Sequence, residues 1–239
     1  MPLPSKYAMT RHPAAFLLAS MCATHVLAQP LPEVSVGRIE RLPHMVSQHV
    51  DARPVDVWLP ADYSTSKRYN VLYMHDGQGL FDATKTWNKQ AWDVHLSVAR
   101  LVAQGRIPDT IVVGVWNNGA LRHSEYYPQK FLPWVPEPVR SEFTAKALAG
   151  QPRADAYLRY LVQELKPAID ARYATRPGRE NTFIMGSSMG GLISLYAYCV
   201  RPDVFGGAMV MSPSLWVANG AVYGVAREQL APGGKLPVQ

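Results

Sequence analysis

Cysteine is scarce in this sequence. Its 239 residues include two cysteines, Cys22 and Cys199. Cys199 lies in an apolar stretch with helical character, where we expect a small buried residue rather than a reactive thiol. No group of cysteines and histidines has the spacing of a zinc site, and the H-E-x-x-H signature is absent. The sequence therefore predicts neither a bound metal nor another cofactor.

Long apolar runs are also rare, and the one near the start reads "AAFLLASMCA". It is too short to cross a bilayer, and no other segment predicts a membrane span. It follows two basic residues and precedes small residues at Val26 and Ala28, which is typical of a secretory signal peptide. We therefore expect residues 1–28 to be removed before Gln29 and the protein to be periplasmic or secreted. Cleavage would leave Cys199 without an intramolecular disulfide partner.

Runs of like charge are absent too. The net charge of +6 comes from 24 Lys and Arg residues against 18 Asp and Glu residues, and both signs are scattered along the chain. Such a mild excess is typical of a solvated surface and does not indicate a nucleic-acid partner. The sequence also has no internal repeat, low-complexity block or domain linker, so we expect one domain over residues 29–239.

Strand patterns and helix patterns alternate along this domain. The first two strand patterns, 34–42 and 49–60, predict an antiparallel hairpin at the edge of a sheet. We expect Pro167 to kink or divide one helix, and we interpret residues 120–150 as a long excursion over the sheet. The other segments read as buried strands at 69–77, 109–119, 182–186 and 205–213, and as helices at 86–105, 154–173 and 189–200. This alternation predicts an α/β domain whose mostly parallel sheet is covered on both faces.

The segment "FIMGSSMGGLIS" carries two adjacent serines where a strand pattern meets a helix pattern. Gly186, Ser188 and Gly190 match the pattern G-x-S-x-G. A register centred on Ser187 would place methionines where the glycines belong. A nucleophile on a sharp strand-to-helix turn has a strained backbone, and side chains two residues away would collide. Ser188 is therefore the candidate nucleophile, and the alternative interpretation is a glycine-rich turn without chemistry.

A serine nucleophile also needs donors for the oxyanion that forms when it attacks a carbonyl. The backbone N–H of Met189, at the start of the helix, is the expected first donor. The second donor should follow an early strand, and "MHDGQGLFD" stands in that place. We therefore expect the N–H of Gln78 to complete the oxyanion hole; the alternative is an ordinary glycine turn.

Four segments resemble the putative esterase family of the α/β-hydrolases: "VLYMHDGQGLFD", "IVVGVWNNGALRHSEYYP", "ELKPAIDARY" and "FIMGSSMGGLISLYAYCVRPDVFGGAMVMSPSLW". That family includes siderophore esterases, feruloyl esterases, S-formylglutathione hydrolase and mycolyltransferases. The resemblance runs from about Val34 to the end of the chain. It implies a three-layer α/β-hydrolase fold and a serine esterase that acts on a small-molecule ester, and it does not fix the substrate.

Carried over by position, the resemblance implies Ser188 as nucleophile and the N–H groups of Gln78 and Met189 as oxyanion hole. Gly79 is a departure, because relatives commonly have Asn at this position.

The resemblance also implies residues on the substrate side. Arg122, Glu125 and Tyr126 match a stretch that lines the active-site side in relatives, and their alternative role is a structural salt bridge with an aromatic lid. Trp216 is either a pocket wall or a core residue.

A histidine after Ser188 is the most informative absence. The family order is Ser, then Asp or Glu, then His, whereas all seven histidines of this sequence precede Ser188. The acids after Ser188 are Asp203, which matches a structural position, and Glu228. His75 is a candidate substitute base, and its alternative role is to order the oxyanion loop. The resemblance thus predicts a chain truncated at the C-terminus, without the last strands of the fold.

Three hypotheses follow from these observations. The first is a serine carboxylic-ester hydrolase that acts through an acyl-enzyme on Ser188, with impaired activity because the triad acid and histidine are absent. The second is an acyltransferase that uses the same serine. The third is an inactive, truncated fragment, unstable because a sheet edge and apolar helix faces are left uncovered.

Overall fold

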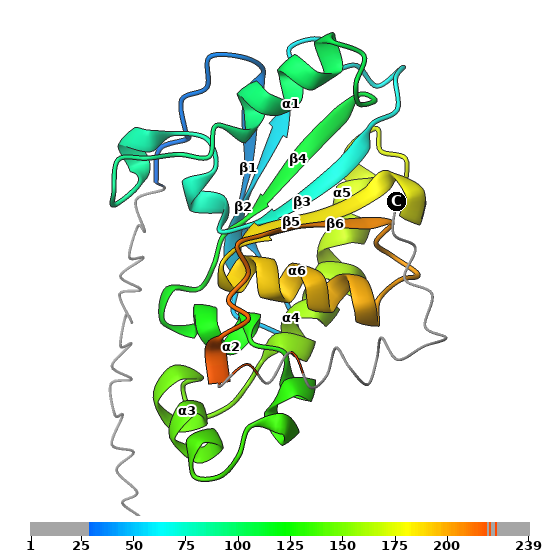
Figure 1. Cartoon of the computed structure of the whole chain (residues 1–239). Helices are drawn as coiled ribbons and strands as arrows, with labels where there is room; N and C mark the ends of the chain where they lie inside the picture. The colour runs from blue at the N-terminus through cyan, green and yellow to red at the C-terminus, as the bar shows by residue number, and fades with distance from the viewer. Residues whose placement is uncertain (1–28, 219, 221–222, 224–239) are drawn as a thin grey trace, which may run out of the picture.

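One sheet of six strands organises the computed structural model, which describes residues 29–218, 220 and 223 (Figure 1). The strands are β1 (Arg38–Met45), β2 (Arg53–Leu59), β3 (Asn70–His75), β4 (Thr110–Val115), β5 (Thr182–Ser187) and β6 (Gly207–Met211). Their order in the sheet is β1-β2-β4-β3-β5-β6. The expected signal peptide at 1–28 and the acid Glu228 lie outside the described residues.

The pairing of the strands confirms a mostly parallel sheet with an antiparallel hairpin at its N-terminal edge. β1 pairs antiparallel with β2, and β2 pairs antiparallel with β4. The strands β4, β3, β5 and β6 run parallel to one another. Because parallel strands end at the same edge of the sheet, the turns after β3, β4 and β5 gather there, where open α/β sheets bind their ligands.

Helices cover both faces of the sheet, as the alternating patterns predict (Figure 1). On β3, Val71 and Tyr73 pack into the core on the side of α4, α5 and α6, whereas Leu72 and Met74 pack on the side of α1. This alternation follows from the two-residue period of a strand, and all four side chains are buried because both faces are covered. The helices are α1 (Val94–Ala103), α2 (Arg122–Tyr126), α3 (Val139–Ala147), α4 (Ala154–Arg159), α5 (Lys166–Arg172) and α6 (Met189–Val200).

Two helices differ from their predicted form. The helix expected over 86–105 begins at Val94, because Asp93 at its N-terminal end has a left-handed backbone with φ 48°. The helix expected over 154–173 is divided into α4 and α5, and a π-helical stretch over Tyr160–Leu165, just before Pro167, joins the two. The wider turn accommodates a proline ring that would otherwise oppose the carbonyl group four residues earlier.

The long excursion expected over residues 120–150 contains regular structure. These residues form α2 and α3 together with short 3-10 helices. Their apolar side chains, including Tyr127, Phe131 and Leu148, are buried in the same core cluster as α4 and α6. The prolines and aromatic residues of this segment therefore build part of the core.

Cys199 is exposed, which corrects the expectation of a buried residue. Earlier turns of α6 bury Leu192, Ile193 and Tyr196 against the sheet, but Cys199 lies on the solvent side of the last turn. The apolar composition of the whole helix concealed this difference, because a helix that is apolar all round gives no periodic signal for its solvent face.

The sheet is less well covered on the α1 side near β6. Phe183 and Met185 of β5 are half-buried there, and Met209 of β6 is 44% exposed. The register pairs Met185 with Met209, so the two methionines are neighbours on one face. An apolar stripe therefore remains accessible along this part of the described sheet.

A buried ion pair fastens α2 to β2. Both terminal nitrogens of Arg53 donate to the Glu125 carboxylate, each at 2.6 Å, and the two side chains are at most 2% exposed. Burial alone would lower the pKa of Arg53, but the Glu125 carboxylate outweighs burial and raises it. The pair therefore stays charged in the core, where removing one partner leaves a costly uncompensated charge.

We predict that Glu125→Gln lowers the free energy of unfolding by about 3 kcal/mol, because Arg53 would remain buried without its counter-ion. Urea denaturation monitored by circular dichroism measures this loss. The matched control is Glu142→Gln, which removes the exposed partner of Lys146 and should cost less than about 0.5 kcal/mol. Equal losses in the two variants would contradict the structural role of the buried pair.

Candidate active site

Ser188 occupies the sharp turn between β5 and α6. Its backbone has φ 58° and ψ −121°, a conformation that non-glycine residues rarely adopt, and its side chain is exposed. The Ser188 N–H donates to the carbonyl of Met211 at 3.1 Å, and the Ser188 carbonyl accepts from the N–H of Ser214 at 3.1 Å. These bonds tie the strained turn to the chain that follows β6, so a reachable hydroxyl is held on a rigid support.

The glycines around Ser188 are required by close backbone approach. A β-carbon at Gly186 would lie 2.5 Å from the carbonyl carbon and oxygen of Gly190. A β-carbon at Gly191 would lie 3.0 Å from the carbonyl oxygen of Met211. The collision between positions two residues either side of the serine is the one that the sequence pattern predicts.

The Ser188 hydroxyl has one hydrogen-bond partner among the described residues. Its Oγ lies 2.9 Å from Oγ of Ser214, and the Ser214 side chain is 4% exposed. Ser187, the neighbouring serine, is half-buried at the end of β5. The hydroxyl that points out of the turn is therefore that of Ser188, and a second hydroxyl orients it.

The loop after β3 lies against this turn. Asp76 has a left-handed backbone with φ 59° and precedes a 3-10 helix at Gly77–Gly79, which contains Gln78. A β-carbon at Gly77 would lie 2.5 Å from the backbone of Gly114, so the loop packs directly on β4. A β-carbon at Gly190 would lie 3.3 Å from Asp76 Oδ2. The loop of Gln78 and the helix start of Met189 are therefore adjacent, as two halves of an oxyanion hole must be.

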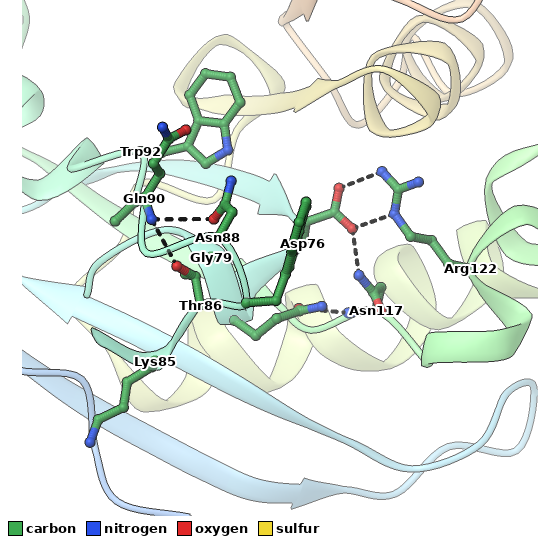
Figure 2. A pocket seen from close by; sticks show the side chains of 12 residues that line it. Asp76, Gly79, Lys85, Thr86, Asn88, Gln90, Trp92, Asn117 and Arg122 are labelled. Carbon is green, nitrogen blue, oxygen red and sulfur yellow. Dashed lines mark hydrogen bonds and ion pairs between the residues drawn. The ribbon is translucent and has the colours of Figure 1, made fainter. Parts of the chain in front are cut away.

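The Asp76 carboxylate is the polar centre of the loop (Figure 2). Arg122 donates from Nε to Oδ1 at 2.7 Å and from Nη2 to Oδ2 at 2.8 Å. Asn117 donates from Nδ2 to Oδ1 at 2.7 Å. Burial alone would raise the pKa of Asp76, but Arg122, with smaller contributions from Asn117 and His75, outweighs burial, so the net pKa is lowered. The carboxylate is therefore ionised at neutral pH and fully engaged.

His75 ends β3 beneath the same turn. It is 2% exposed, its Nδ1 shares a 2.9 Å hydrogen bond with the Tyr157 hydroxyl, and its Nε2 has no partner among the described residues. Burial lowers the pKa of His75 to about 4; Asp76 opposes the shift and Arg122 adds to it. The described structure contains no hydrogen bond between His75 and Ser188. His75 is thus a neutral, packed imidazole below the loop.

The residues that the resemblance predicts on the substrate side have different partners and different exposure in the structure. Arg122 pairs with Asp76, whereas Glu125 pairs with Arg53, so each belongs to a different salt bridge. Tyr126 is fully buried, and its hydroxyl accepts from the Asp76 N–H at 3.4 Å. Trp216 is 76% exposed, which excludes the core alternative.

A cleft of about 820 Å³ opens beside the loop (Figure 2). Asp76, Gln78 and Arg122 form one wall. Two exposed tryptophans, Trp87 and Trp92, also line the cleft and are 94% and 44% exposed. The remaining lining residues are mostly polar: Gly79, Lys85, Thr86, Asn88, Gln90, Ala91 and Asn117. The cleft therefore offers aromatic faces and amide groups next to the proposed oxyanion hole.

Other functional features can be stated for the described residues only. Their His, Cys, Asp and Glu side chains form no group of three or more that could hold a metal ion. None of their helices combines the length and the apolar character that a membrane crossing requires. Asp203 pairs with Arg201 at 2.7–2.9 Å near the end of α6, away from Ser188 in the hydrogen-bond network.

Sequence reasoning missed three residues of this site. Ser214 follows β6 in the quoted segment "MSPSLW", but nothing in its pattern shows that it meets Ser188. Asn117 follows β4 in "WNNG", and Asp76 follows β3. Their common signal is a polar residue within three positions of the end of a parallel strand, which is where α/β sheets place functional groups.

Comparisons with known proteins identify the family of the chain. Residues 48–232 match the profile of the family described as "Putative esterase". The siderophore triacetylfusarinine C esterase of Aspergillus fumigatus is 34% identical over 146 residues, which are 61% of this chain and 44% of that protein. The siderophore enterobactin esterase of Emericella nidulans is 24% identical over 177 residues, which are 71% of this chain and 54% of that protein. The chain spans about half the length of these curated relatives.

The solved structures with a similar fold include an IroE-like serine hydrolase from Shewanella oneidensis. It superposes with a TM-score of 0.60 at 22% identity, over 81% of this chain and 56% of that chain. This likeness confirms the α/β-hydrolase fold expected from the sequence.

We predict that Gly186→Ala destabilises the protein by about 3 kcal/mol, because the new methyl group meets the backbone of Gly190 and neither can move freely. Thermal or urea unfolding measures the loss. Gly79→Ala is the matched control, since a β-carbon there meets nothing within 4 Å. It should change stability by less than about 0.5 kcal/mol. Similar stability of both variants would show that the turn is looser than described.

The lowered pKa of His75 predicts a pH-dependent stability. The pKa is about 4 in the folded protein against 6.5 for a free histidine, so the unfolded chain binds more protons between these values. Stability is therefore lost as the pH falls through this window. Between pH 7 and pH 5 the wild type should lose about 2 kcal/mol more than His75→Gln, measured by urea denaturation. Parallel losses in the two proteins would show that His75 is not the group responsible.

Proposed function

Because the chain belongs to the putative esterase family, we propose that it is a serine hydrolase of carboxylic esters. The observation that carries the proposal is the exposed Ser188 hydroxyl on a strained turn, where a β-carbon at Gly186 would collide with the backbone of Gly190. The relatives named above as siderophore esterases support ester hydrolysis, and the serine hydrolase of similar fold supports the serine mechanism.

The proposed reaction passes through an acyl-enzyme. Ser188 Oγ attacks the ester carbonyl, and the carbonyl oxygen becomes an oxyanion that accepts from the N–H groups of Met189 and Gln78. The alcohol leaves when the tetrahedral intermediate collapses. Water then attacks the acyl group on Ser188 and releases the acid. The start of α6 favours this charge, because the first N–H groups of a helix have no partner within it.

The activating base is the part of the mechanism that the described residues do not supply. The partner of Ser188 Oγ is the hydroxyl of Ser214, which is not a base at neutral pH. His75 is engaged with Tyr157 and is protonated only near pH 4. We therefore propose that residues 1–239 hydrolyse esters slowly, through the oxyanion hole and a weakly activated serine. His75 supports the loop in this account and does not act as the base.

The cleft beside Gln78 is the proposed place for one half of the ester. The exposed rings of Trp87 and Trp92 suit an aromatic or otherwise flat group, and the amides around them suit its polar substituents. Trp216 is exposed and follows Ser214, the partner of Ser188, by two residues, and we propose that it contacts the other half. Tyr126 supports this side indirectly, because its buried hydroxyl accepts a hydrogen bond from the Asp76 N–H.

Two finer expectations remain proposals. Export to the periplasm or the medium rests on the signal peptide expected at 1–28. Acyl transfer to a hydroxyl acceptor would use the same serine and the same donors, and no feature of the described residues favours it over hydrolysis.

We predict that imidazole added to the solution replaces the missing base. It should raise the rate of p-nitrophenyl acetate hydrolysis by the 239-residue protein about 10- to 100-fold, because a general base typically contributes at least this much. The rate is followed by p-nitrophenolate absorbance after subtraction of the protein-free reaction. Ser188→Ala should abolish the imidazole-dependent increase.

Ser187→Ala is the matched control for this experiment, since it removes the adjacent hydroxyl on β5 and should keep the increase. An increase that persists in Ser188→Ala would contradict the assignment of the nucleophile.

A further inference from the structure

The backbone of Asp76 is held in an unfavourable conformation. Its φ of 59° lies in the left-handed region, which costs a residue with a β-carbon free energy and persists only where its surroundings enforce it. The neighbouring Gly77 has no positive φ, so the left-handed conformation of this turn falls on Asp76 and not on the glycine. An enforced conformation at this position fixes the direction in which the next peptide groups point.

The contacts that enforce it converge on both sides of Gln78. The Asp76 carbonyl accepts from the Gly79 N–H at 2.9 Å, which closes the turn around Gln78. Asn117 donates from its side chain to Asp76 Oδ1 at 2.7 Å and from its backbone N–H to Gln78 Oε1 at 3.2 Å. Asn117 thus binds both the Asp76 side chain and the Gln78 side chain.

The strongest of these contacts is the two-pronged ion pair with Arg122. The pair is only partly exposed, at 24% for Arg122 and 23% for Asp76. Two parallel hydrogen bonds of 2.7 and 2.8 Å fix the plane of the carboxylate as well as its position. A β-carbon at Gly190, two residues after Ser188, would lie 3.3 Å from Oδ2 of that carboxylate, so the carboxylate faces this turn. The ion pair of Asp76 and Arg122 therefore lies where the loop of Gln78 approaches the turn of Ser188.

We propose that Asp76 and Arg122 act as positioning residues, whose ion pair locks the left-handed turn at Asp76 and so aims the Gln78 N–H at the oxyanion. This inference rests on the proposed function, because an aimed donor matters only if Ser188 attacks a carbonyl. It also gives Arg122 a role different from direct substrate binding. Its Nε and Nη2 are already committed to Asp76, and its guanidinium lies 5.1 Å from the centre of the Tyr126 ring.

The test compares Asp76→Asn, Arg122→Gln and the double variant with the wild type. Two quantities are measured: kcat and KM for p-nitrophenyl acetate in the imidazole-supported assay, and amide hydrogen exchange of the segment 76–80 by mass spectrometry. The matched control is Glu142→Gln, which breaks the exposed ion pair with Lys146 on α3. Arg122→Lys serves as the conservative variant, since it keeps the charge but not the two-pronged geometry.

Each single variant should lower kcat roughly 10- to 100-fold with KM within about twofold, because donor alignment acts on the transition state. The double variant should be no worse than the single ones, because either change already releases the lock. Exchange of segment 76–80 should accelerate in all three. Arg122→Lys should recover part of kcat, and Glu142→Gln should match the wild type in both measurements.

Three results would overturn the inference. The first is unchanged exchange of segment 76–80 in both single variants. The second is additive losses of kcat in the double variant. The third is a rise in KM of Arg122→Gln for the anionic ester p-nitrophenyl hemisuccinate without a rise for the neutral ester, which would make Arg122 a substrate-binding residue. A different result would contradict the proposed function itself: identical rates of ester hydrolysis by the wild type and Ser188→Ala.

Discussion

The close approach of two backbone turns is the constraint on which the rest of this site depends. The turn at Ser188 and the loop after β3 come within van der Waals contact at Gly190, where a β-carbon would meet both His75 and Asp76. This contact is possible because β3 and β5 are parallel neighbours that end at the same edge of the sheet. A serine hydroxyl and two candidate N–H donors are thereby brought to one place without any contribution from a flexible segment.

Polar groups behind the two turns preserve that approach. Asp76 is charged and fully engaged, whereas His75 is neutral and packed below it, so neither is free to act as a base. Further from the surface, the pair of Arg53 and Glu125 fastens α2, and α2 carries Arg122. The chemistry proposed for the exposed serine therefore depends on charged groups behind the two turns that take no part in the bond changes. Among the described residues, activation of the serine is the step for which no side chain is provided.

Local patterns were sufficient to predict most of the elements and the sharp turn that carries Ser188. The period-two strands, the apolar helices and the glycine spacing around Ser188 are properties of short segments, and the sheet, its direction and the collision at Gly186 follow from them. Pairings over long sequence separations were not predictable. Arg122 meets Asp76 across 46 positions and Arg53 meets Glu125 across 72. The sequence could not show which acidic side chain forms an ion pair with which arginine, because the pairing depends on how α2 packs against the sheet. Cys199 was misjudged for a related reason, since composition does not reveal which side of an apolar helix is left uncovered.

The most direct test of the account is to identify the residue that reacts with an ester-like phosphonylating reagent. The 239-residue protein would be treated with a fluorophosphonate in the presence of imidazole, digested and analysed by tandem mass spectrometry. The account predicts a single major adduct on Ser188, because the phosphonyl oxygen occupies the place of the oxyanion and accepts from the same N–H groups. An adduct on Ser187 or Ser214, or none on the turn between β5 and α6, would contradict it.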